Sequence, residues 1–230
     1  MDSILEKFEE RTQEIDEYLK LIELISEPDA RIHRQGKRPK RIENIAIKTM
    51  KASCFLMLYN LVESSIRDSL ATLYEKINAE NHDLASFKAC VKEIWIAQNF
   101  RKKIDPLSSN HSSYLKLVKE MVGNILASNP IFLDPKELQI SGNLDARRIR
   151  EIFLLHQIPT KVHYRAVDGG ELKTVKDKRN SLAHGNIGFA DCGQEYSIQD
   201  IIRIKKQTVV YLRSSLKNVK KYLERTQYAA

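Results

Sequence analysis

The segment KDKRNSLAHG, residues 176–185, places an arginine five positions before a histidine. Histidine suits proton transfer because its ordinary pKa of about 6.5 leaves both protonation states populated near neutral pH. Arginine suits phosphate because its planar guanidinium donates to two oxygens at once and stays charged. Cleavage of RNA through the ribose 2′-hydroxyl needs both kinds of group. Arg179 and His184 are therefore candidate catalytic residues.

Helical geometry gives a partial test of this motif. Asn180 and His184 are four positions apart and share one helix face, so they can meet. Arg179 lies about 140° around an ideal helix from His184, and only its long side chain can swing to the same place. A homodimer that faced two such helices would bring two histidines and two arginines into one cleft. The spacing also fits an ordinary basic helix that ends at Gly185.

A second polar pair lies in the most apolar stretch of the chain, residues 52–74. Glu63 and Arg67 are four positions apart and therefore lie on one face of the helix that this stretch predicts. They are either a surface ion pair or groups that orient polar chemistry in a cleft, and spacing leaves both interpretations open.

Basic side chains on two predicted helices are candidates for binding an RNA backbone. One set flanks the motif, and the other lies on a short helix for which Asn143 is the expected N-cap. The arginines of that helix fit phosphate contacts and solvated or paired side chains equally well. The candidates are Lys176, Lys178, Arg147, Arg148 and Arg150.

Composition narrows the class of protein. The net charge of +8 favours an acidic partner, with nucleic acid ahead of an anionic membrane. Three cysteines far apart, with no CxxC pair, indicate neither a disulfide framework nor a zinc site, and we expect no metal or cofactor. The N-terminus has no apolar signal core, and the apolar run 52–62 is shorter than the roughly 20 residues of a membrane span. We expect a cytoplasmic protein without a membrane partner.

Apolar periodicity predicts an all-α fold, a helical bundle with long core helices and little or no sheet. The first helix should begin at a capping box formed by Ser3 and Glu6 and end before Pro28. The fourth should bury the stripe Leu115, Val118, Met121, Val122 and Ile125. The remaining helices are expected over residues 43–79, 84–103, 114–127, 144–155, 171–184 and 197–223.

The segments between these helices complete a single expected domain over residues 1–230. A mobile basic linker should occupy about 27–42, either as a phosphate-binding arm or as a solvated loop. Residues 105–113 are expected to form a loop within an inserted middle segment, about 104–170.

The motif KDKRNSLAHG resembles the signature of the HEPN superfamily, in which an arginine and a polar residue precede a histidine after a short spacer. The segments FLMLYNLVESSIRDSL and SGNLDARRIREIF resemble the core helix and middle segment of a prokaryotic, toxin- or defence-type branch of HEPN nucleases. The three matches lie in order over residues 54–188. The resemblance implies a helical bundle that dimerises around the motif. It implies that Arg179 and His184 are catalytic, with Asn180, Glu63 and Arg67 supporting them.

The resemblance also implies a function. Many members are metal-independent endoribonucleases, so we expect a homodimer that cleaves single-stranded or looped RNA, with transfer RNA a candidate target. Such proteins often act as toxins or phage-defence effectors with an antitoxin partner. Asn186 stands where some HEPN toxins have a tyrosine that a partner enzyme modifies. The alternatives are a non-catalytic module that binds RNA or protein and, with less support, a DNA-binding accessory protein.

Overall fold

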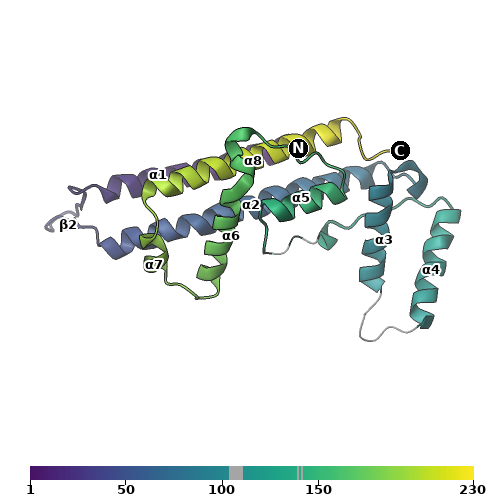
Figure 1. Cartoon of the computed structure of the whole chain (residues 1–230), viewed down its shortest axis with the longest axis horizontal. Helices are drawn as coiled ribbons and strands as arrows, with labels where there is room; N and C mark the ends of the chain where they lie inside the picture. The colour runs from purple at the N-terminus through teal and green to yellow at the C-terminus, as the bar shows by residue number, and fades with distance from the viewer. Residues whose placement is uncertain (104–110, 139, 141) are drawn as a thin grey trace. The chain divides into compact units, whose positions relative to one another are not determined.

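The computed structural model describes residues 1–103, 111–138, 140 and 142–230, and Figure 1 shows that nearly all regular structure in this part is helical. In the described residues, short 3-10 helices cover Leu84–Ser86 (η1), Pro135–Glu137 (η2) and Tyr164–Gly169 (η3). The expected all-α fold is confirmed. The α-helices of the described residues are α1 Asp2–Ser26, α2 Asn44–Ala79, α3 Ala89–Lys103, α4 His111–Leu126, α5 Ala146–Leu155, α6 Gly170–Ala183, α7 Phe189–Gln194 and α8 Ile198–Glu224.

Helix α1 follows the predicted periodicity but begins earlier than its capping signal. Its N-cap is Met1, which makes no side-chain cap hydrogen bond. The expected capping box is therefore wrong, because Ser3 already lies inside the first turn. The helix ends at Ser26, and the next residue, Glu27, has the extended backbone that is favoured before a proline. Its buried apolar side chains are Ile4, Phe8, Ile15, Leu19 and Ile22.

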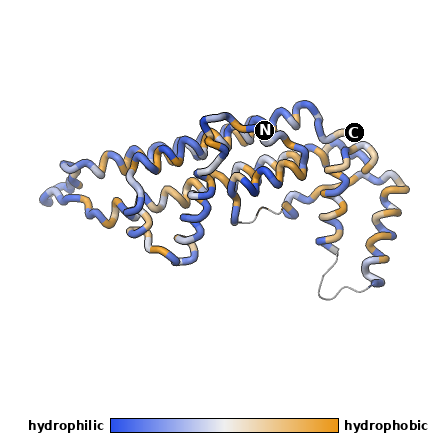
Figure 2. Tube along the Cα trace, viewed as in Figure 1, coloured by the Kyte–Doolittle hydropathy of each residue, from blue (hydrophilic) through white to orange (hydrophobic). Residues whose placement is uncertain are grey.

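The basic linker contains a small hairpin. Strands β1 (Arg31–Ile32) and β2 (Lys40–Arg41) pair antiparallel, with Arg31 opposite Arg41. All four residues are exposed, and Figure 2 shows this segment as predominantly hydrophilic. The mobility expected of the linker stays a prediction.

Helix α2 has nearly the predicted bounds, 43–79, and starts one residue later. By length and composition it is apolar enough to cross a membrane, although its longest uninterrupted apolar run is short. The central helix of a protein core meets the same criterion because it also buries side chains on most of its faces. Along α2 these buried side chains include Phe55, Leu58, Tyr59, Leu61, Val62, Ile66, Leu70 and Leu73.

The chain divides into two compact units. The first comprises residues 1–66, 140–149 and 161–216, and the second comprises the remainder. In the first unit, α8 is tied to α1 by ion pairs from Lys205 to Asp16 at 2.7 Å and from Arg213 to Glu9 at 2.7 Å. The expectation of one domain over residues 1–230, with an inserted segment at about 104–170, stays a prediction.

The second unit buries a histidine as a structural group. His156 donates from Nδ1 to the Ile152 carbonyl at 2.7 Å, and its Nε2 accepts from the Tyr74 hydroxyl at 3.0 Å. Both ring nitrogens are therefore satisfied in the neutral form.

The burial of His156 predicts a dependence of stability on pH. Burial lowers its pKa, against the opposing hydrogen bond to Ile152. As the pH falls through about 6.5, the unfolded chain takes up this proton before the folded chain does. The stability that neutral, buried His156 contributes to the fold is therefore fully present above about pH 6.5. Below that pH the free energy of unfolding falls by at most about 1.4 kcal/mol per pH unit from this histidine.

Urea unfolding at pH 7.5, 6.5 and 5.5 measures this contribution. The His156→Phe variant should show a flatter pH profile than wild type between pH 6.5 and 5.5. The exposed His33 provides the control, since His33→Ala should keep the wild-type slope. Equal slopes for wild type and His156→Phe would contradict the assignment.

Helix α4 buries a different face from the one predicted. Helix α4 starts at His111, so residues 111–113 of the expected loop are helical, while residues 105–110 of that loop lie outside the described residues. Only Leu117 and Met121 are buried in α4, whereas Figure 2 shows the helix rich in hydrophobic residues. Of the five residues in the expected stripe, only Met121 is buried, so the prediction is wrong for the other four. Exposed large side chains of α4 are Tyr114, Leu115, Val118, Val122, Ile125 and Leu126.

Two leucines on α4 test this packing directly. Leu117 is 2% exposed and Leu115 is 46% exposed. Truncation of a buried leucine removes apolar contacts and leaves a cavity, so Leu117→Ala should cost about 3 kcal/mol of unfolding free energy. Leu115→Ala should change it by less than about 0.5 kcal/mol. Denaturant titration of both variants measures these free energies of unfolding. A larger loss for Leu115→Ala than for Leu117→Ala would support the stripe predicted from the sequence.

Candidate active site

Helix α6 ends at the histidine of the motif because the next residue is a glycine. Gly185 has a φ of +69°, in the left-handed region that side chains other than glycine rarely adopt. Its N–H donates to the Leu182 carbonyl at 3.3 Å, and the Asn186 N–H donates to the Ser181 carbonyl at 2.8 Å. These two bonds form a Schellman motif. They fix the chain direction on both sides of His184.

The imidazole of His184 is available to an outside group. The residue is exposed, and its backbone N–H donates to the Asn180 carbonyl at 3.0 Å. Among the described residues, no hydrogen bond or ion pair engages its ring, and none joins it to Arg179.

Arg179, in contrast, is held on several sides. Its Nη1 donates to the Gly142 carbonyl at 3.0 Å and to Asn180 Oδ1 at 2.8 Å. Its Nη2 lies 3.8 Å from Glu63 Oε2, and its guanidinium carbon lies 4.2 Å from the centre of the Tyr59 ring. Stacking and ion pairing with these neighbours restrict the rotamers of the arginine. The guanidinium is thus positioned before any ligand arrives.

The turn at residues 142–144 is part of the same network. The Leu144 N–H donates to the hydroxyl of the buried Tyr59 at 3.1 Å. Asn180 Nδ2 donates to Asn143 Oδ1 at 2.7 Å. Burial raises the pKa of Tyr59, so its hydroxyl stays protonated at neutral pH. Helix α2, this turn and α6 therefore form one hydrogen-bonded frame around Arg179.

Helix α5 begins at an aspartate. Asp145 Oδ1 accepts from the Arg148 N–H at 2.9 Å, as an N-cap side chain does. The expectation that Asn143 caps this helix is therefore wrong, because its amide bonds to α6. Asp145 Oδ2 also accepts from Lys176 at 2.8 Å. Burial alone would raise the pKa of Asp145, but these hydrogen bonds hold it below its ordinary value.

The two lysines of the motif segment, residues 176–185, are engaged within the chain. Lys176 is bound to Asp145, and its side chain is 18% exposed. Lys178 pairs with Glu195 and lies 5.4 Å from the centre of the Tyr196 ring. The hydrogen bond that Lys178 donates to Glu195 raises the pKa of Lys178. A phosphate would have to compete with these carboxylates for either lysine.

The other predicted residues are four arginines on α2 and α5. Arg147 is exposed and Arg148 is half-buried on the first turn of α5. Arg67, one turn beyond Glu63 on α2, and Arg150 belong to the second unit. Their supporting and RNA-binding roles stay predictions.

Comparison with known proteins decides the family. The model of the HEPN_MAE_28990-like HEPN family matches residues 1–228. The chain belongs to the HEPN superfamily. Comparisons with curated proteins and with solved structures give no significant match. Within the described residues, no group of three His, Cys, Asp or Glu side chains is arranged to hold a metal ion.

Four residues of this candidate site were not predicted from the sequence to belong to it: Tyr59, Gly142, Asn143 and Asp145. Tyr59 precedes Glu63 by four positions on α2, so a search for aromatic neighbours on the same helix face would have found it. The turn residues carry no local signal, because they meet α6 only through the tertiary fold.

Proposed function

We propose that this HEPN protein is an endoribonuclease that cleaves single-stranded or looped RNA. The observation that supports it is the contrast within the motif: Arg179 is anchored, while the His184 imidazole is exposed and without a partner in the described chain. A fixed cation suits the phosphate, and an unengaged imidazole suits proton transfer.

The reaction proposed is an internal transesterification. The ribose 2′-oxygen attacks the adjacent phosphorus as its proton passes to a base, and the bond from phosphorus to the 5′-oxygen breaks. The leaving oxygen takes up a proton, so the products carry a 2′,3′-cyclic phosphate and a 5′-hydroxyl. His184 moves protons, and Arg179 donates to the non-bridging phosphate oxygens. Unpaired RNA is the proposed substrate because its backbone can adopt the in-line geometry.

The proposed active form is a homodimer with a composite site. The attacking and leaving oxygens lie on opposite sides of the phosphorus, so one proton acceptor and one proton donor are needed at once. One chain contributes one motif histidine. Two copies of α6 facing each other across a two-fold axis supply two imidazoles and two guanidinium groups to one phosphate.

The proposed biological role is that of a toxin or phage-defence effector, held in check by an antitoxin protein. Transfer RNA is the first substrate to test. Control by modification of a tyrosine two positions after the histidine is not proposed, because Asn186 occupies that position.

The direct test incubates the purified protein with transfer RNA in excess EDTA. Fragments that end in 2′,3′-cyclic phosphate should accumulate, and light scattering should give the mass of two chains. No cleavage of transfer RNA or of single-stranded RNA would overturn the enzymatic proposal and favour a non-catalytic RNA- or protein-binding module. Cleavage by a strictly monomeric protein would overturn the composite site.

A further inference from the structure

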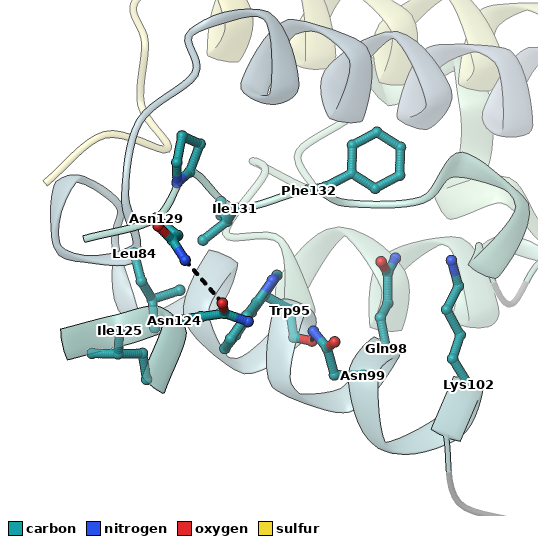
Figure 3. A pocket seen from close by; sticks show the side chains of 11 residues that line it. Leu84, Trp95, Gln98, Asn99, Lys102, Asn124, Ile125, Asn129, Ile131 and Phe132 are labelled. Atoms are coloured by element: carbon teal, nitrogen blue, oxygen red, sulfur yellow. Dashed lines mark hydrogen bonds between the residues drawn. The ribbon is translucent and has the colours of Figure 1, made fainter. Parts of the chain in front are cut away.

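The second unit contains a pocket with both apolar and polar lining, and none of its lining residues belongs to the motif. Its volume is about 470 Å³, within the range of small-molecule sites. Figure 3 shows the side chains that line it, which come from η1, α3, α4 and the segment after α4. Its residues combine apolar and aromatic side chains with four amides and one lysine: Leu84, Trp95, Gln98, Asn99, Lys102, Asn124, Ile125, Asn129, Pro130, Ile131 and Phe132.

Each of three asparagines in this pocket uses only one end of its side-chain amide in a hydrogen bond with another described residue. Asn129 Nδ2 donates to Asn124 Oδ1 at 3.0 Å, the bond drawn in Figure 3. Asn99 Nδ2 donates to the Trp95 carbonyl at 2.9 Å. Among the described residues, no side-chain bond engages the carbonyl oxygens of Asn129 and Asn99, the nitrogen of Asn124 or the indole N–H of Trp95. The pocket therefore offers both donors and acceptors.

The other polar side chains hold the wall in place. Gln98 Oε1 accepts from the Asp134 N–H at 2.9 Å, and Gln98 Nε2 donates to the Asp134 carbonyl at 3.3 Å. Lys102 pairs with the Asp134 carboxylate, which neutralises its charge. The α3 wall of the pocket is thus held against Asp134, and the pocket offers hydrogen bonds rather than net charge.

We propose that this pocket binds a single unpaired nucleobase. A base has flat apolar faces, which suit the aromatic and aliphatic walls, and an edge that alternates donors and acceptors, which suits the uncommitted amides. A phosphate alone is a poor ligand, because the one lysine in the pocket is paired. The base belongs either to a free nucleotide or to an RNA strand. This binding does not depend on the proposed cleavage.

Trp95 makes the test direct because it is the only tryptophan in the sequence. The 230-residue chain with the His184→Ala change, chosen so that RNA stays intact, is titrated with AMP, GMP, CMP and UMP. Indole fluorescence is excited at about 295 nm, where bases absorb little. Saturable quenching by at least one nucleotide is expected, and ribose 5-phosphate should have no effect. No saturable change with any nucleotide or oligonucleotide would overturn the proposal.

Comparing a mononucleotide with a longer oligonucleotide shows whether the bound base comes from a free nucleotide or from an RNA strand. An unstructured pentanucleotide that binds at least about tenfold more tightly than its mononucleotide indicates an RNA strand, and equal affinities indicate a free nucleotide. Either result supports the pocket. The experiment is informative whether or not the wild-type protein cleaves RNA.

Substitutions of asparagines in the pocket test whether the nucleotide binds there. Asn99→Ala and Asn124→Asp should each weaken binding of the preferred nucleotide by about tenfold or more, because each removes hydrogen bonds to the base edge. Asn60→Ala is the matched control, since Asn60 is exposed on α2 outside the pocket. Circular dichroism checks folding, and the isosteric Asn124→Asp change keeps the test valid if Asn99→Ala unfolds. Wild-type affinity in a folded Asn124→Asp protein would overturn the assignment.

Discussion

His184→Ala is expected to lower the rate of RNA cleavage by about 10²- to 10⁴-fold, the usual contribution of a general acid or base. Because the imidazole is exposed and makes no bond within the described chain, its removal should leave the fold unchanged. Initial rates on end-labelled RNA in EDTA measure the effect, with thermal unfolding as the check on folding. His33→Ala, which removes another exposed histidine, should keep wild-type activity. Wild-type rates for His184→Ala would contradict the proposed role.

Arg179→Lys separates charge from geometry at the same site. Lysine keeps the positive charge but cannot donate to Gly142 and Asn180 while stacking on the ring of Tyr59. The rate is therefore expected to fall by about 10²-fold, as when one donor to a developing negative charge is lost. Full activity in the lysine variant would show that charge alone suffices and that the anchoring frame has no catalytic consequence.

Gly193→Ala is expected to cost about 3 kcal/mol or more of unfolding free energy, as overpacking a rigid contact does. Gly193 is buried on α7, and a Cβ added there would lie 1.8 Å from the backbone oxygen of Lys48 on α2. That oxygen belongs to a helix backbone and cannot rotate away, so α7 would have to move off α2. The melting temperature should fall by roughly 6–12 °C.

The matched control is Gly170→Ala. Gly170 has ordinary helical dihedral angles, and a Cβ added there would meet nothing within 4 Å. Alanine at such a position restricts the unfolded chain, so it should stabilise the protein by about 0.4–1 kcal/mol. Calorimetry on both variants gives the comparison. A melting temperature for Gly193→Ala equal to that of wild type would show that α7 does not pack on α2 in this way.

The helices were predictable because their signals are local. The apolar repeat of α1 and the long apolar stretch of α2 identify those helices within a few residues of the chain, as does Gly185 for the end of α6. The prediction of buried residues failed where a helix has more than one apolar face that could be buried. On α4, several neighbouring faces are apolar, and only the packing partner decides that Leu117 rather than Leu115 is buried.

In the candidate site too, the local features were predictable from the sequence and the long-range contacts were not. The sequence by itself determined the HEPN motif, its two candidate catalytic side chains and the glycine that ends their helix, because all of these lie within ten consecutive residues. Only the tertiary structure decided that Arg179 rests on Tyr59 and binds the turn at Gly142, while Lys176 is bound to Asp145. Those contacts join residues more than 30 positions apart, and no local periodicity encodes which distant side chain will lie beside a given charge.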